Sequence, residues 1–122
     1  VLGDRSMLEE LIYNLCDNGI RYNRPGGTVT LTTGADSGGS WLTERDTGIG
    51  IPEEHQARIF ERFYRVDKSR SRDSGGTGLG LAIVKHIALQ HGAAISLTSH
   101  EGRGSSITVR FPPEGGQPEE TI

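Results

Sequence analysis

The stretch SMLEELIYNLCDNGIRY, residues Ser6–Tyr22, decides how the rest of the chain is arranged. Apolar side chains recur along it at intervals of three and four residues, which is typical of a helix that packs one face on a core. A capping box, Ser6-Met-Leu-Glu9, predicts that the helix begins near Ser6. The residues expected to face the core are Leu8, Leu11, Ile12, Leu15, Cys16, Gly19 and Ile20.

A second face of the same helix is polar. Glu10, Asn14, Asn18 and Tyr22 follow each other at steps of four, so they stack along one line of the helix. Asn is a mediocre helix former because its amide competes for backbone hydrogen bonds. Two interpretations stay open at this point: a solvated face, or amide oxygens directed at a ligand or a hard cation.

Length and composition describe one domain without a strong charge bias. A chain of 122 residues can bury a core of its own. The net charge of −3 gives no indication of nucleic-acid or membrane binding. The single cysteine, Cys16, can form no intrachain disulfide, and we expect it to pack in the interior. Without a signal peptide or a long apolar run, the chain is expected to be cytosolic. Because it starts almost on a helix, we expect it to be part of a longer protein.

The remaining pattern alternates pairs of strands with helices. Because the helices separate two strand pairs, we expect an α/β (α+β) two-layer sandwich, with a mixed sheet and about three helices on one face. The folded domain is expected over residues 1–112, and residues 113–122 are expected to be a disordered tail. The predicted elements are strands at 28–33 and 40–45, a short helix from Pro52 to about residue 60 or 63, a helix at 78–91, and strands at 94–99 and 105–111.

Two glycine-bearing loops carry the chemistry. Ser74-Gly-Gly-Thr-Gly-Leu-Gly-Leu81 runs directly into a predicted helix, which indicates an anion site built from backbone N–H groups, or else a flexible linker. Asp46-Thr-Gly-Ile-Gly50 sets a carboxylate at the end of a strand. A buried carboxylate needs a donor, and the exocyclic amine of a purine is one; the alternative is a turn-forming Asp.

Taken together, these pieces resemble the ATP-binding domain of sensor histidine kinases. Five motifs of that family have counterparts in the family's order, spread from about Val1 to Pro112. They are the N box at Asn14–Asn18, the first glycine box at Asp46–Gly50, the F box at Ile59–Arg65, the second glycine box at Gly76–Gly80 and a last glycine motif at Gly102–Ser105. Phe63–Asp67 and Ala82–Lys85 resemble the phosphate and cell-envelope sensor branch.

This resemblance implies the Bergerat fold of gyrase-type ATPases, with ATP and Mg²⁺ as cofactors. It implies that Asn18 is the metal ligand and that Asp46 accepts from the adenine amine, with Ser105 helping through a water. Phosphoryl transfer would depend on Asn14, Asn18 and Arg65. Phe60 and Phe63 would anchor a lid. The other nucleotide-binding positions implied are Arg21, Tyr22, Gly48, Gly50, Tyr64, Gly76, Thr77, Gly78, Leu79 and Gly80.

Some positions depart from the family's pattern. Thr47 stands where Asn is usual, Ala93 where Gly is usual, and Gly19 where Ala is commoner. None of these changes removes an implied ligand. A glycine inside a helix costs about 1 kcal/mol or less relative to alanine, so Gly19 is expected only to weaken the helix.

One position bears on the reaction. Hydrolytic relatives with a similar fold carry Glu four residues before the metal-binding Asn, and this chain carries Asn14 there. An amide cannot take a proton at neutral pH, so we expect the γ-phosphoryl group to go to a histidine rather than to water. None of the four histidines (His55, His86, His91 and His100) has the sequence context of that family's acceptor.

The expected acceptor is therefore a histidine-bearing dimerisation domain N-terminal to Val1, with a response regulator as an indirect partner. The full protein is expected to be a homodimer and a membrane-anchored sensor, and this chain alone a monomer. Competing hypotheses are a hydrolytic ATPase of the same fold, a degenerate interaction module, and nucleic-acid binding through an arginine-rich segment. The last is weak, because the segment has few adjoining aromatic residues and the net charge is negative.

Overall fold

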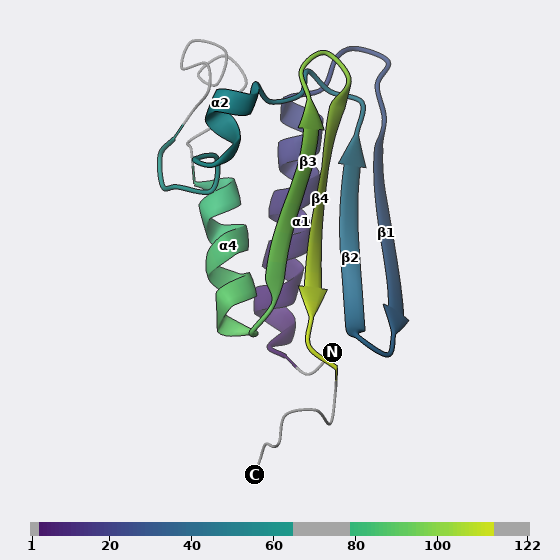
Figure 1. Cartoon of the computed structure of the whole chain (residues 1–122), viewed down its shortest axis with the longest axis vertical. Coiled ribbons are helices and arrows are strands. Elements are labelled where there is room, and N and C mark those ends of the chain that lie inside the picture. The colour runs from purple at the N-terminus through teal and green to yellow at the C-terminus, as the bar shows by residue number, and fades with distance from the viewer. Residues whose placement is uncertain (1–2, 65–78, 114–122) are drawn as a thin grey trace.

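The computed structural model describes residues 3–64 and 79–113. Two layers are evident in Figure 1: a four-stranded sheet, and helices α1 and α4 side by side on one face of it, with α1 against β1 and β2 and α4 against β3. In chain order the elements are α1 (Arg5–Arg21), β1 (Val29–Asp36), β2 (Gly39–Asp46), α2 (Glu53–Gln56), α4 (Gly80–Gln90), β3 (Ala94–His100) and β4 (Gly104–Phe111). The two-layer α/β sandwich with about three helices is thereby confirmed.

The sheet is antiparallel throughout its described strands, so the prediction of a mixed sheet is wrong. The strand order is β1-β2-β4-β3, and each neighbouring pair is antiparallel. The reason is that β4, and not β3, is the strand of the second hairpin that pairs with the first hairpin. After α4 the chain enters the outer edge as β3 and returns as β4 beside β2, so β3, which runs parallel to β2, never pairs with it.

Inward-facing residues form rows across the strands. Leu42 on β2 lies opposite Val109 on β4, which lies opposite Ile95 on β3. Both Leu42 and Val109 are buried, and together with Leu11 and Leu15 of α1 they belong to the core. Because side chains alternate across a strand, the same face also carries the residues four positions away along each strand, where the row consists of Asp46, Ser105 and Ser99.

Helix α1 begins two residues earlier than its capping box indicates. Asp4 is the N-cap, and its Oδ1 accepts a hydrogen bond from the Met7 backbone N–H at 3.0 Å. Asp, like Ser, is among the best N-cap residues, and it precedes Ser6 in the chain, so the helix includes Ser6. The predicted core stripe is also too wide: Leu11, Leu15 and Gly19 are buried, whereas Ile12 and Ile20 are exposed.

This cap leads to a prediction about stability. Asp4→Ala is expected to lower the free energy of unfolding by about 1 kcal/mol, because the Met7 N–H loses its acceptor. Ser6→Ala serves as the matched control, and it is expected to change stability by less than about 0.5 kcal/mol. Urea denaturation of the two variants measures both values. Equal losses would show that Asp4 is not the residue that caps the helix.

Other boundaries differ from the sequence-based expectations for local reasons. Helix α2 spans only Glu53–Gln56, because the chain then turns in steps of three: Arg58 N bonds to His55 O, Glu61 N to Arg58 O and Tyr64 N to Glu61 O. In the first hairpin, β1 extends to Asp36 and β2 already begins at Gly39, so a tight turn joins the two strands. Within the described ranges, no helix combines the length and the apolar character needed to cross a membrane. The predicted disordered tail lies almost wholly outside the described residues.

Candidate functional site

Asp46 is the centre of the candidate site. It is the last residue of β2, and only 8% of its surface is exposed. Its Oδ1 accepts a hydrogen bond from the Gly48 backbone N–H at 3.0 Å. The carboxylate therefore has one donor from its own loop, and its remaining acceptor positions are available to a further donor.

A polar row crosses the sheet at the level of Asp46. Ser105 on β4 lies opposite Asp46, and Ser99 on β3 lies opposite Ser105. The two serine hydroxyls are 2.8 Å apart, and Ser99 Oγ also accepts the Ile51 N–H at 2.8 Å. Ser105 thus lies beside Asp46 as the resemblance implies. Ser99 was missed, although the alternation of its strand sets it on this face.

The loop after Asp46 needs its glycines. A Cβ on Gly48 would come within 2.5 Å of the Tyr22 carbonyl oxygen and 2.9 Å of Asp46 Oδ1, and Gly50 has a φ of 74°. Ile49 N donates to Tyr22 O at 3.1 Å, and Ile49 O accepts from Gly102 N at 2.7 Å. The C-terminal end of α1 and the β3–β4 turn therefore hold the loop from both sides.

Arg24 joins the same three segments. Its Nη2 donates to Gly48 O at 3.0 Å and to Gly102 O at 2.7 Å. Carbonyl oxygens that a guanidinium bridges are fixed relative to each other. The sequence offered no indication of this role, because Arg24 stands in a loop of helix-breaking residues between the first helix and the first strand.

The amide face of α1 meets the start of α4. Asn14 and Asn18 are both half-buried. Asn14 Nδ2 donates to Glu10 O at 2.8 Å, and a Cβ on Gly80 would be 3.3 Å from Asn14 Oδ1. The amide is thus oriented with its oxygen towards the first residue of α4. The N-cap position of α4 is Leu79, whose side chain cannot accept a hydrogen bond.

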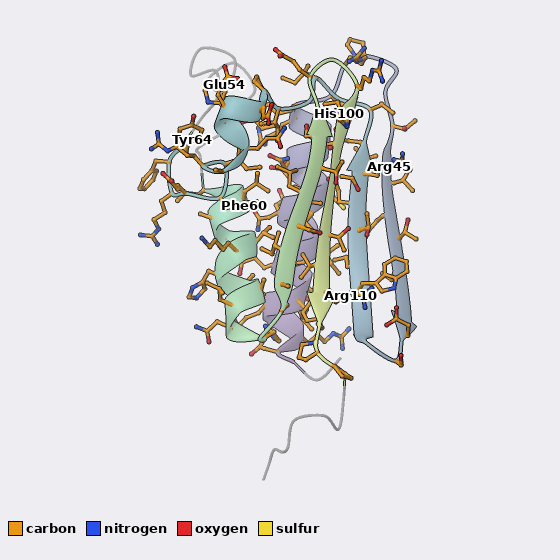
Figure 2. The ribbon with its side chains drawn as sticks, viewed as in Figure 1. Arg45, Glu54, Phe60, Tyr64, His100 and Arg110 are labelled. Carbon is orange, nitrogen blue, oxygen red and sulfur yellow. The ribbon has the colours of Figure 1, made fainter. Side chains whose placement is uncertain are left out.

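Other predicted site residues are less closely connected to Asp46. Arg21 Nε donates to Asp17 at 2.7 Å, one turn back on α1. Tyr64, beside α2 in Figure 2, hydrogen-bonds to His55, and the Arg58 guanidinium lies 4.4 Å from its ring centre. Phe60 packs on the core, as an anchor would, but Phe63 is 63% exposed. Arg65, Gly76, Thr77 and Gly78 lie outside the described residues.

A buried carboxyl group that the sequence analysis missed lies next to this site. Glu44, two residues before Asp46 on the same face of β2, is 0% exposed. Burial, and then the neighbouring charge of Asp46, raise the pKa of Glu44 to about 8. Alternation from Leu42 to Asp46 predicts that Glu44 faces inward, but a charged residue type argues against burial.

The described residues contain no group of three or more His, Cys, Asp or Glu side chains able to hold a metal ion. A cation at this site would therefore need amide or ligand oxygens, and Asn14 and Asn18 are side chains of that kind. Oxygen donors of this type suit Mg²⁺, which usually retains several waters and takes further ligands from substrate phosphates.

Comparisons with known proteins agree with this arrangement. The family model described as histidine kinase-, DNA gyrase B- and HSP90-like ATPase matches residues 3–115. The sensor-like histidine kinase SenX3 of Mycolicibacterium smegmatis is 48% identical over 112 residues, which is 92% of this chain and 29% of SenX3. The phosphate regulon sensor protein PhoR of Pseudomonas aeruginosa is 43% identical over 111 residues, 91% of this chain and 25% of PhoR. The chain thus spans between a quarter and a third of these relatives.

Solved structures have the same fold. The mycobacterial sensor histidine kinase MprB superposes with a TM-score of 0.78 at 35% identity, covering 92% of this chain and 74% of that one. Full-length ShkA in complex with AMPPNP also gives a TM-score of 0.78, at 32% identity, covering 92% of this chain and 22% of ShkA. On the extent of these matches, and on the order of elements and loops that they share, the chain belongs to the family of histidine kinase-, DNA gyrase B- and HSP90-like ATPases.

Proposed function

We propose that this chain is the ATP-binding catalytic domain of a two-component sensor histidine kinase. In this proposal it binds Mg-ATP and transfers the γ-phosphoryl group to a histidine in another domain of the same protein or of its dimer partner. The observation that carries the proposal is the convergence of three segments: Tyr22 O at the end of α1 accepts from Ile49 N in the Asp46–Gly50 loop, and Asn14 Oδ1 on α1 faces Gly80. A nucleotide bound there would meet a base-reading acid and a helix start at its two ends.

The site residues fit a bound magnesium ion. The Asn14 N–H₂ group donates to Glu10 O, and the amide oxygen is directed towards the start of α4. Asn18 follows one turn later on the same half-buried face. Asn18 would hold the ion with Asn14 beside it, and Mg²⁺ would neutralise charge on the phosphates. The backbone N–H groups at Leu79 and Gly80 would add donors for the same phosphates.

The acceptor histidine is proposed to lie outside this chain. His91 accepts the Asp4 N–H on Nε2 at 3.1 Å, which joins the end of α4 to the start of α1, and its Nδ1 is 2.8 Å from Ile87 O within α4, so both ring nitrogens have partners. His55 is paired with Tyr64. Asn14 supplies no base for water, because an amide does not accept a proton at neutral pH. Both points favour transfer to a separate histidine over hydrolysis.

The proposal includes the context expected for such a domain. A histidine-bearing dimerisation domain would precede this chain in a homodimeric sensor, a response regulator would receive the phosphoryl group next, and the domain would lie on the cytoplasmic side of a membrane-anchored protein. The support is the resemblance to SenX3 and PhoR, of which the matched segment makes up 29% and 25%.

Labelled ATP tests the proposal directly. The chain is incubated with γ-labelled Mg-ATP, alone and with a purified histidine-bearing domain from the same reading frame. Label is expected on the added domain and not on this chain. Stable label on this chain, or rapid release of inorganic phosphate without the acceptor, would overturn the transfer mechanism and favour a hydrolytic ATPase.

The magnesium assignment gives a smaller, separate prediction. Asn18→Ala is expected to lower ATP affinity about tenfold in Mg²⁺ and to change it little in EDTA, since only the metal-dependent part of binding is lost. Calorimetry in both conditions measures the difference. Gln90→Ala, which removes an exposed carboxamide at the C-terminal end of α4, is the control. An equal loss with and without Mg²⁺ would remove Asn18 from the metal site.

A further inference from the structure

Glu44 occupies an apolar position. Its cross-strand neighbours on the inward face are Leu31 on β1 and Ile107 on β4, and it is fully buried. Ionisable side chains are almost never fully buried without a partner. This one lies two residues from Asp46, on the same face of the same strand.

Glu44 and Asp46 differ in their donors. Asp46 accepts the Gly48 N–H, whereas neither oxygen of Glu44 receives a hydrogen bond from any donor in the described part of the chain. Two ionised carboxylates could not pair, but a protonated Glu44 can donate its O–H to the Asp46 carboxylate. Burial first, and the charge of Asp46 second, raise the pKa of Glu44 to about 8, so its proton is retained at neutral pH.

Gly19 on α1 makes room for this carboxyl group. A Cβ at Gly19 would overlap Glu44 Oε2 and would also lie 3.2 Å from Val29 Cγ2. The glycine that weakens α1 therefore lets the helix pack directly over the Glu44 carboxyl group. A side chain at residue 19 would require this carboxyl group to move.

We propose that Glu44 is a positioning residue, which in its protonated form donates a hydrogen bond to Asp46 and so fixes that carboxylate to accept from the exocyclic amine of a bound adenine. The proposal rests on the proposed function, because it assumes that Asp46 reads adenine. It adds a residue outside the resemblance that led to Asp46, and it makes adenine recognition dependent on one buried proton.

The groups that face Glu44 are few. Asp46 on β2 and Cys16 on α1 are the titratable side chains that act on it, while Leu31 and Ile107 contribute only hydrocarbon. Burial, and then Glu44 itself, raise the pKa of the Cys16 thiol, so Cys16 stays neutral where Glu44 titrates. Among the described residues, Asp46 is thus the nearby charge through which the proton of Glu44 acts.

The test is ADP binding to this chain by calorimetry as a function of pH. Bound adenine covers the carboxyl pair, which favours the protonated state further, so binding above the pKa of Glu44 takes up a proton. Affinity is expected to fall about tenfold from about pH 7.5 to about pH 9.5. Heats measured in two buffers of different ionisation enthalpy are expected to reveal uptake of about one proton near the upper pH.

Two variants separate positioning from packing. Glu44→Gln keeps the shape and can donate to Asp46, so it is expected to bind ADP within about threefold of the unmodified chain and without pH dependence or proton uptake. Glu44→Val fills the apolar row but donates nothing, and about tenfold weaker binding is expected at neutral pH. Glu54→Gln, on exposed α2, is the matched control. Thermal unfolding verifies that each variant is folded.

The outcomes distinguish this proposal from the proposed function. If the unmodified chain does not bind ADP, or if Asp46→Asn binds it equally well, the proposed function fails. If Asp46 is required but all Glu44 variants retain the unmodified affinity and pH profile, only the role of Glu44 is overturned. Should the variants not fold, infrared spectra of the unmodified chain decide: a buried protonated carboxyl band at neutral pH supports the proposal, and its absence overturns it.

Discussion

Replacing Asp46 with Asn is expected to weaken ATP binding about 100-fold. The reason is that a buried hydrogen-bonding group left without its matching partner costs much of the binding energy, and here the adenine amine would lose its carboxylate acceptor. The Asn side chain can satisfy either the Gly48 N–H or the adenine amine with its single oxygen, and its own N–H₂ would face a donor. Preference for ATP over purine triphosphates that lack the 6-amine is expected to disappear in the same variant. Calorimetric titration with ATP and with inosine triphosphate measures both effects.

Asp36→Asn is the control for that substitution. Asp36 is an exposed carboxylate at the other end of the first hairpin, where it pairs with Arg110 at 3.1 Å. Its loss removes the same charge from the chain without touching the site, and exposed ion pairs are worth little. Unchanged affinity in Asp36→Asn together with unchanged affinity in Asp46→Asn would exclude Asp46 as the adenine acceptor.

The second large effect concerns stability against pH. The pKa of Glu44 is raised from 4.5 to about 8 by burial and by the neighbouring charge of Asp46. The folded chain therefore keeps a proton that the unfolded chain releases, and the contribution to stability is complete below pH 4.5 and lost as the pH rises towards 8. Across that window the free energy of unfolding is expected to fall by roughly 4 kcal/mol relative to a variant without this group.

The measurement is a difference between two proteins. Urea denaturation of the unmodified chain and of Glu44→Gln is repeated at several pH values across the window, so that all other titrating groups cancel. The difference in the free energy of unfolding between the two proteins is expected to change steadily with pH. The unmodified chain becomes less stable relative to Glu44→Gln as the pH rises. A difference in the free energy of unfolding that stays constant within about 0.5 kcal/mol across the window would mean that Glu44 is ionised in the folded state.

Much of this site was predictable because its residues obey local rules. The steps of four that align Asn14 with Asn18 are fixed by helix geometry, and Asp46 ends a strand directly before two glycines whose backbone requirements the structure confirms. The resemblance to sensor histidine kinases depended on these short motifs, and the family match confirms it. The roles assigned to Arg65, Gly76, Thr77 and Gly78 stay predictions, because those residues lie outside the described part of the chain.

The sequence by itself determined the helices, the two hairpins and the glycine-bearing loops, since each depends on contacts between near neighbours along the chain. Only the tertiary structure decided that β4 rather than β3 pairs with β2, that Arg24 bridges Gly48 and Gly102, and that Glu44 is buried beneath Gly19. These depend on residues tens of positions apart, whose pairing is set by packing. Burial gives Glu44 its proton, and burial is a property of the folded chain as a whole.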